Sequence, residues 1–205
     1  IHLTSFNQKT SSQLSRALAQ LEEQGAQGLV LDMRNNPGGL LSAAVEVADR
    51  FLQGGPIVHV VGRNGRKQTI NANTRVEFAP RPMVILVNGN SASAAEIVAG
   101  ALRDRGIALL VGEQTFGKGL VQTLIPLRNG AGLSLTTARY QTAGGHNIHE
   151  TGITPDEVVE FPEDRMESLY ESLQREKVDL EDPQLRRALE VLAEWMSTSS
   201  MPLAS

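Results

Sequence analysis

Runs of apolar residues alternate with short polar turns along the chain, in an order that predicts strands followed by helices. Met83–Val87 is continuously apolar and predicts a short buried strand, whereas the apolar positions of residues 97–102 recur at helical spacing. Asn88-Gly89-Asn90 supplies the turn between them, and the helix is expected to run to about Arg105. Ser93 therefore stands where this helix begins.

A second unit of the same kind lies nearer the N-terminus. Leu29–Arg34 predicts a buried strand, Asn35–Gly39 a tight turn, and residues 41–51 a helix with one apolar face. Two consecutive glycines let the backbone approach a ligand closely, so a free N–H at Gly38 or Gly39 is a candidate donor to an oxyanion. A plain turn is the alternative interpretation.

Further strands and helices are expected along the rest of the chain. Strands are predicted at residues 1–6, 57–61, 67–70, 107–112, 120–127 and 133–141, and an early helix carries Leu14, Leu18 and Leu21. Asn64-Gly65 predicts a hairpin between the second and third of these strands. From Glu163 to Trp195 the chain is rich in charged residues and is predicted to be helical. It carries an apolar stripe formed by Leu185, Leu189, Leu192 and Trp195. This stripe fits either core packing or an oligomer contact.

Composition narrows the class of protein. The 205 residues suffice for one domain with a sizeable core, and 40% hydrophobic content is ordinary for a globular chain. A net charge of -4 without a block of Lys or Arg gives no reason to expect nucleic acid or an anionic membrane as partner. The absence of cysteine excludes disulfides and thiolate chemistry, and no apolar run is long enough for a transmembrane helix.

Ser93 is the first candidate for chemistry. Ser93 and Glu96 have the spacing of a capping box, which places a serine hydroxyl beside the unpaired N–H groups of a helix N-terminus. That position suits a developing oxyanion. Serine is also a common structural N-cap, so the interpretation of Ser93 as a nucleophile requires a base elsewhere in the chain. The surrounding residues lack the G-x-S-x-G pattern, which argues against an α/β-hydrolase.

Lys118 is the candidate base, since Ser–Lys pairs are a known variant of serine activation. A lysine accepts a proton only where its surroundings disfavour the charged ammonium, and the apolar neighbours Phe116, Leu120 and Val121 are expected to provide this. Gln122 is a neutral group that could orient the lysine if the glycines around Lys118 bend the chain. A surface lysine between glycines is the alternative interpretation.

Two other kinds of site are disfavoured. Gly112–Lys118 matches the P-loop pattern G-x-x-x-x-G-K, but Gly119 replaces the hydroxyl that holds magnesium and a strand follows in place of a helix. The four histidines, His2, His59, His146 and His149, lack the pattern of a zinc protease, and none is placed by sequence beside Ser93. No metal or cofactor is expected.

Four motifs together resemble the carboxyl-terminal processing peptidases, also called tail-specific proteases, of serine peptidase family S41. The motifs span roughly residues 1–159 in consistent order, and they are Asp32–Gly39, Ser91–Glu96, Thr115–Gly119 with Gln122, and Gly152–Asp156. The resemblance implies Ser93 as nucleophile, Lys118 as base and Gln122 as the group that holds the lysine. It also implies an oxyanion hole from the N–H of Ala94 and of the glycine turn, with Gly39 preferred over Gly38, and it makes Ser91 a turn residue.

The resemblance also carries a fold and a division of the chain. It implies an α/β fold, a ClpP/crotonase-like β-β-α core with a small cap and a helical C-terminal extension. Residues 1–160 are then the catalytic core, and residues 161–205 the extension and a candidate oligomerisation element. The resemblance implies a PDZ domain upstream in the precursor. A signal peptide in the precursor is also expected, because the chain begins at Ile1 without methionine.

The implied function is a serine endopeptidase that cleaves proteins at or near their C-termini. Expected partners are protein substrates with apolar C-termini, an adaptor or activating protein, and further copies of the chain. The periplasm is the expected compartment, with the plastid lumen as the alternative. Two rival functions stay open: a catalytically silent or partner-activated binding scaffold of the same fold, and a crotonase-type acyl-CoA enzyme.

Overall fold

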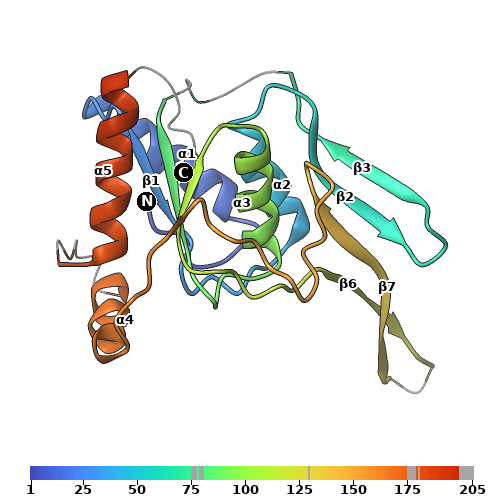
Figure 1. Ribbon diagram of the computed structural model, residues 1–205. Coiled ribbons are helices and arrows are strands. Elements are labelled where there is room, and N and C mark those ends of the chain that lie inside the picture. The colour runs from blue at the N-terminus through green and yellow to red at the C-terminus, as the bar shows by residue number, and fades with distance from the viewer. Residues whose placement is uncertain (75–77, 79–80, 129, 175–178, 180, 199–205) are drawn as a thin grey trace.

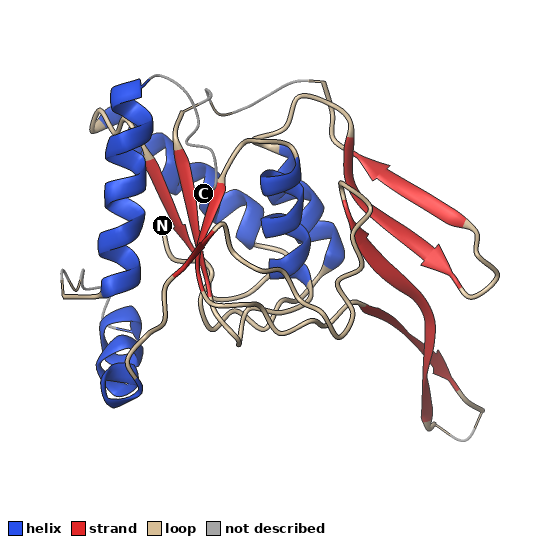
Figure 2. Ribbon diagram, in the orientation of Figure 1, coloured by secondary structure: helices blue, strands red, loops and turns tan. Residues whose placement is uncertain are grey.

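Two four-stranded sheets form the framework of the protein (Figures 1 and 2). The computed structural model describes residues 1–74, 78, 81–128, 130–174, 179 and 181–198. The first sheet is parallel, in the order β1 (Leu29–Asp32), β4 (Met83–Val87), β5 (Leu109–Gly112) and β8 (Glu157–Val158). The second is antiparallel, in the order β3 (Lys67–Asn71), β2 (Pro56–Gly62), β7 (Gly132–Thr142) and β6 (Leu120–Pro126).

Helices fill the space between the sheets and cover the outer face of the parallel sheet. Helices α1 (Thr10–Glu23), α2 (Leu41–Asp49) and α3 (Ala94–Asp104) lie on the inner side, with α2 and α3 between the two sheets (Figure 1). A short 3₁₀ turn, η1 (Glu163–Arg165), leads into α4 (Met166–Gln174), and α5 (Pro183–Thr198) packs on the other face of the parallel sheet. The expected α/β fold, with a cap and a helical C-terminal extension, is confirmed.

The central strand β4 is buried on both faces of the parallel sheet. All five of its residues are buried, which is the pattern of a parallel strand covered on each side. Met83, Ile85 and Val87 belong to the main core with the inner helices, whereas Val84 and Leu86 contact the α5 side. A continuous apolar run is therefore required here, as the sequence predicted.

The apolar stripe of the last helix is occupied within the chain. Ala188, Val191 and Leu192 are buried against the parallel sheet, and Leu185 and Trp195 pack beside them. Leu189 is 45% exposed and lies outside this contact. The stripe is thus core packing in this structure, and a role of residues 161–205 in oligomerisation stays a prediction.

The N-terminal segment differs from the expected strand over residues 1–6. It makes only two isolated bridges, from His2 to Asp32 and from Phe6 to Gly39. A continuous ladder does not form because the chain after β1 turns away before the second bridge. The hairpin around Asn64-Gly65 and the other predicted strands of the described chain are confirmed, with small shifts at their ends. Among the described residues, no helix is long and apolar enough to cross a membrane.

Candidate active site

Ser93 sits at the carboxyl end of the parallel sheet, between β4 and the first residue of α3. Its backbone has φ 55° and ψ −111°, a conformation that residues other than glycine rarely adopt. Such strain costs of order 1–3 kcal/mol and is concentrated at functional sites. An ordinary serine N-cap has an extended backbone, so the conformation distinguishes Ser93 from a purely structural cap.

The two turns that follow β1 and β4 are joined to each other. The N–H of Ala92 donates to the carbonyl oxygen of Asn36 at 2.9 Å. The buried hydroxyl of Ser91 donates to the carbonyl oxygen of Met33 at 2.8 Å. Ser91 therefore acts as a turn residue, and the turn Asn35–Gly39 is held directly beside Ser93.

Gly38 and Gly39 differ in the availability of their N–H groups. A Cβ atom on Gly38 would lie 2.8 Å from both the Cβ of Ser93 and the nitrogen of Ala94, so only glycine fits there. The N–H of Gly38 already donates to Oδ1 of Asn36 at 2.9 Å. Within the described chain, the N–H groups of Gly39 and Ala94 have no acceptor. This difference favours Gly39 over Gly38 as an oxyanion donor.

The carboxylate of Glu96 connects the Ser93 turn to the loop that carries Lys118. It is fully buried and accepts four hydrogen bonds. Its Oε2 accepts the N–H of Ser93 at 2.7 Å and the N–H of Lys118 at 2.9 Å. Its Oε1 accepts the Thr115 hydroxyl at 2.6 Å and the N–H of Gly117 at 2.7 Å. The sequence indicated only a helix cap for Glu96, because its other partners lie about twenty residues away along the chain.

The loop of Lys118 is also held by the segment that follows β7. The carbonyl oxygen of Gly117 accepts the N–H of Glu150 at 2.9 Å. The Thr115 hydroxyl accepts the N–H of Ile153 at 2.7 Å. These bonds give the Gly152–Asp156 motif a physical role, since its residue Ile153 helps to fix the backbone that leads into Lys118.

The side chains of Lys118 and Gln122 are arranged differently from the sequence prediction. Lys118 is exposed, and Phe116 beside it is 64% exposed, so the expected apolar enclosure of the lysine is not formed by the described residues. The amide of Gln122 donates to the Thr136 hydroxyl at 2.8 Å and accepts from the Ser134 hydroxyl at 3.1 Å. Gln122 thus bonds across the hairpin to β7, and its contact with Lys118 stays a prediction.

Behind the glycine turn lies a buried charge cluster that the sequence analysis did not identify. The guanidinium of Arg34, 2% exposed, bonds Asp32 at 2.6 Å, Asp182 at 2.7 Å and Gln184 at 3.0 Å. Burial alone lowers the pKa of Arg34, but the hydrogen bonds and charges of Asp32 and Asp182 outweigh it and raise the pKa above its ordinary value. The cluster joins the start of α5 to the end of β1.

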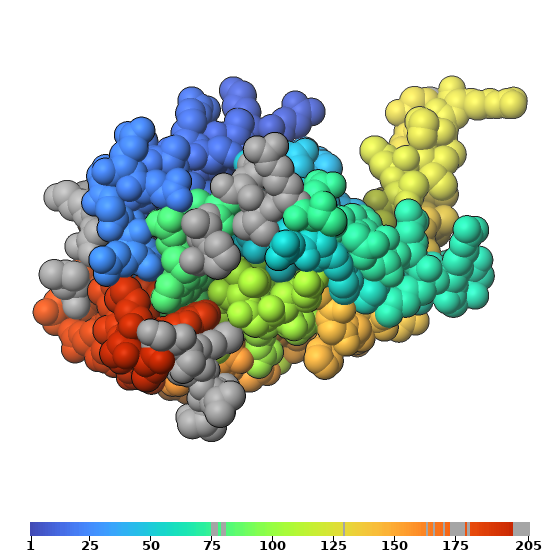
Figure 3. Space-filling model, turned by 90° about the horizontal axis from the view of Figure 1, so that it is seen from above, coloured from blue at the N-terminus to red at the C-terminus, as the bar shows by residue number. Residues whose placement is uncertain are grey.

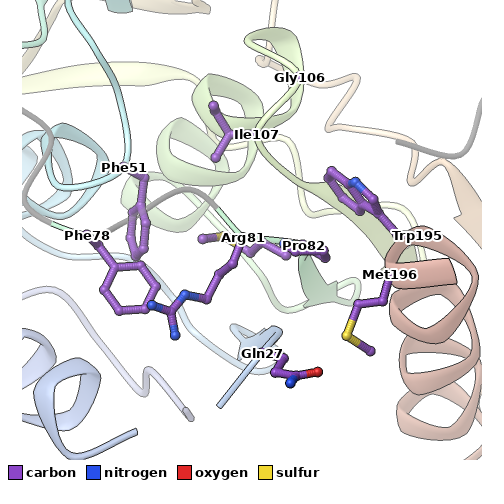
Figure 4. Close-up of a pocket in the computed structure, with 10 residues that line it drawn as sticks. Gln27, Phe51, Phe78, Arg81, Pro82, Gly106, Ile107, Trp195 and Met196 are labelled. Atoms are coloured by element: carbon purple, nitrogen blue, oxygen red, sulfur yellow. The ribbon is translucent and has the colours of Figure 1, made fainter. Parts of the chain in front are cut away.

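Two other features of the described chain lie outside this site. A pocket of about 470 Å³ is lined by Phe51, Ile107 and Trp195 among others, near Met83 at the opposite end of β4 (Figure 4). None of the predicted site residues lines it. No cluster of three or more potential metal ligands occurs among the described residues. The candidate site is therefore the group of turns at the carboxyl ends of β1, β4 and β5, where parallel sheets commonly bind ligands.

Known proteins are similar to this chain in sequence. Residues 1–159 match the model of the family described as peptidase family S41. A carboxyl-terminal-processing protease of Synechocystis is 51% identical over 162 residues, which cover 79% of this chain and 38% of that protein. The carboxy-terminal processing protease CtpA of Bacillus subtilis is 42% identical over 164 residues, which cover 80% of this chain and 35% of that protein.

A solved structure supports the same relationship. The photosystem II D1 C-terminal processing protease superposes with a TM-score of 0.74 and 42% identity, over 78% of this chain and 41% of the other. The chain thus spans well under half the length of the relatives it matches.

Proposed function

The chain belongs to peptidase family S41, and on this premise we propose that it is the core of a serine endopeptidase with Ser93 as nucleophile and Lys118 as base. The observation that carries the proposal is the Glu96 carboxylate, whose Oε2 accepts both the Ser93 and the Lys118 N–H. Two backbone groups that share one oxygen atom lie close together. A serine and a lysine brought together in this way can form a nucleophile–base pair.

The proposed reaction proceeds through an acyl-enzyme. Lys118, in its neutral amine form, takes the proton of the Ser93 hydroxyl while the Oγ atom attacks the peptide carbonyl carbon. The N–H groups of Ala94 and Gly39 stabilise the oxyanion. As the C–N bond breaks, Lys118 gives its proton to the leaving amine. Water then attacks the ester, Lys118 takes the water proton, and the proton returns to Ser93 as the new carboxyl product leaves.

In this proposal Gln122 orients Lys118 after the Gln122 amide exchanges its present hydrogen-bond partners for the lysine. Its amide bonds Ser134 and Thr136 in the present structure and stays on the strand that follows Lys118. A shift of the Lys118 side chain toward Ser93 and of the Gln122 amide toward Lys118 would complete the site. Hydrogen bonds of catalytic groups often tighten only when substrate is bound.

Substrates, partners and compartment follow from the relatives as proposals. We expect protein substrates cleaved at or near apolar C-termini, and recognition by a PDZ domain elsewhere in the whole protein, by binding the C-terminal strand and carboxylate. An adaptor or activating protein and self-association are further proposed partners. The relatives include bacterial proteins and several named chloroplastic, among them one from Tetradesmus obliquus, which agrees with either a periplasmic or a plastid-lumen protein.

The two alternatives differ from the peptidase in what they require. A binding scaffold would need the turns but neither the Ser93 hydroxyl nor the Lys118 amine. A crotonase-type acyl-CoA enzyme would use oxyanion donors without a lysine base, and the family match does not favour it.

Mass spectrometry tests the proposed function. A loosely folded protein with an apolar C-terminus is incubated with the chain and with Ser93→Ala, and samples are quenched in acid. We expect new fragments with the unmodified chain only, together with a substrate fragment esterified to the peptide that contains Ser93. Cleavage that persists in Ser93→Ala would remove Ser93 from the mechanism, whereas no cleavage by the chain or by its longer parent protein would favour the scaffold.

The Glu96→Gln substitution tests whether this carboxylate positions the two groups. The amide keeps the size but can accept at only one of its two ends, so about two of the four bonds are lost. We expect kcat to fall by about 100-fold or more with little change in KM, and the free energy of unfolding to fall by about 2–4 kcal/mol.

Thr115→Val is the control, because it removes one bond to Glu96 and the bond from the Ile153 N–H, and it leaves the bonds from the Ser93 and Lys118 N–H groups to Glu96 in place. Steady-state kinetics and thermal unfolding of both variants separate positioning from stability. Equal losses of kcat in the two variants would contradict a positioning role.

A further inference from the structure

The antiparallel sheet concentrates positive charge in a chain that is negative overall. Residues 56–74 and 114–149, which contain the sheet and its connections, include no Asp or Glu, whereas the whole chain has a net charge of -4. Their cationic residues are Arg63, Arg66, Lys67, Lys118, Arg128 and Arg139. Figure 3 shows the two hairpins of this sheet, β2–β3 in green and β6–β7 in yellow, projecting from the same side of the molecule.

In the part of the chain that the structure describes, the arginines of this sheet and its two hairpin turns have no carboxylate partners. Among the described residues, the side chains of Arg63, Arg66, Arg128 and Arg139 have no carboxylate within salt-bridge distance. Several arginines elsewhere in the chain are paired with carboxylates, for example Arg103 with Asp156 at 2.8 Å and Arg81 with Glu22 at 2.7 Å. The sheet therefore presents guanidinium groups that remain available to an external anion.

Two of these arginines line a groove that begins beside the candidate active site. The groove has a volume of about 1020 Å³, and its lining includes Arg63, Arg139, Leu120 and His149. Arg139 on β7 is directly opposite Leu120 on β6 and Val61 on β2, so the three side chains share one face of the sheet.

The groove lies close to Lys118, both through a neighbouring residue in the sequence and through a backbone hydrogen bond. Leu120 is two residues beyond Lys118, and the carbonyl oxygen of Gly119 accepts the N–H of Tyr140 at 2.7 Å. Strand spacings then place the backbone of Arg139 about 8 Å from that of Lys118. An extended peptide advances about 3.3 Å per residue, so this distance corresponds to roughly two to four residues of substrate.

We propose that this groove binds the polypeptide next to the scissile bond, and that Arg139 with Arg63 selects an acidic side chain roughly two to four residues from that bond. The inference rests on the proposed peptidase function, whose substrate it specifies. An acidic polypeptide is favoured over nucleic acid because the four strands of the sheet carry no Phe or Trp, and their one Tyr, Tyr140, is 8% exposed and offers little surface for base stacking.

Paired fluorescent peptides test the proposal on the 205-residue chain. The peptides share the cleavage sequence found by mass spectrometry and differ only in Glu or Gln at the positions two to four residues from the scissile bond. We expect kcat/KM to be roughly 3- to 20-fold higher for the Glu peptide, and this preference to weaken in high salt.

Arg139→Gln, and more completely the double variant with Arg63→Gln, is expected to remove the preference and leave kcat on the Gln peptide unchanged. Arg128→Gln is the matched control, since Arg128 belongs to the same sheet region but not to the groove lining. Arg139→Glu is expected to prefer a Lys peptide. Equal kcat/KM for the Glu and Gln peptides, or an equal effect of Arg128→Gln, would overturn the inference.

Binding to the Ser93→Ala chain, followed by fluorescence anisotropy, separates this inference from the proposed function. Preferential binding of the Glu peptide that is lost in Arg139→Gln supports the groove even if no peptide is cleaved. Cleavage without any preference for the Glu peptide would support the peptidase function and overturn the proposed role of the groove. If a single-stranded oligonucleotide binds more tightly than the Glu peptide, and this binding is lost in Arg139→Gln, the ligand of the groove is nucleic acid and the proposal of an acidic polypeptide is overturned.

Discussion

Lys118→Arg is expected to inactivate the chain as completely as Ser93→Ala does, with turnover lower by on the order of 10⁴-fold or more. The arginine keeps the positive charge and nearly the length of the side chain, but a guanidinium cannot give up its proton near neutral pH. A base that acts in the reaction is therefore lost, while an electrostatic contribution would be retained. The measurement is kcat/KM on a peptide that the unmodified chain cleaves.

The same substitution should leave the fold intact. The Lys118 side chain is exposed, and its backbone N–H, which bonds Glu96, is unchanged by the substitution. We expect the free energy of unfolding to change by less than about 0.5 kcal/mol. Lys67→Arg, on the outer strand β3, is the matched control and should keep full activity.

Combining the two substitutions tests whether Ser93 and Lys118 act as a unit. The Ser93→Ala/Lys118→Arg double variant should be no less active than either single variant, because groups of one catalytic unit are not additive. A Lys118→Arg variant that retains a tenth or more of the activity would refute the lysine base.

Arg34→Ala is expected to cause the largest loss of stability, about 3–5 kcal/mol. The substitution leaves the carboxylates of Asp32 and Asp182, 8% and 2% exposed, without the cation that both contact. For a chain of this length, the loss corresponds to a melting temperature lower by roughly 6–20 °C. Thermal unfolding followed by circular dichroism measures it.

A more exposed ion pair provides the comparison for Arg34. Arg103 bonds Asp156 at 2.8 Å, but its side chain is 35% exposed, so Arg103→Ala should cost no more than about 1–2 kcal/mol. Neutralising the acids as well, in Arg34→Met/Asp32→Asn/Asp182→Asn, should recover part of the stability, since the unpaired charges are then removed. An Arg34→Ala variant within 1 kcal/mol of the unmodified chain would show that the cluster does not hold α5 to β1.

Local patterns were enough to identify the elements around the site. Five consecutive apolar residues predict β4 because a strand between two helical layers is buried on both faces. The two turns and the helices after them were equally readable, since each depends on neighbours within a few residues. By contrast, residues 1–6 alternate like a strand but form only two bridges, because their partner segment turns away.

Motifs identified the candidate site residues, which are Ser93, Ala94, Lys118, Gly38 and Gly39. The sequence could not predict how these residues are arranged relative to one another in space. The preference for Gly39 gains support only from a contact, the bond from the Gly38 N–H to Asn36. Gln122 was expected to reach Lys118, but hydroxyls on the neighbouring strand are closer partners for its amide in this structure.

By itself, the sequence determined the order of strands and helices, the family resemblance and the candidate nucleophile and base, because these depend on spacing along the chain. Only the tertiary structure decided that Glu96 joins the Ser93 turn to the Lys118 loop, and that Arg34 is paired with Asp182. It also decided that two arginines without carboxylate partners among the described residues, Arg63 and Arg139, line a common groove. The physical reason is that buried hydrogen bonds and charges must find partners in space, and folding brings those partners from distant parts of the chain.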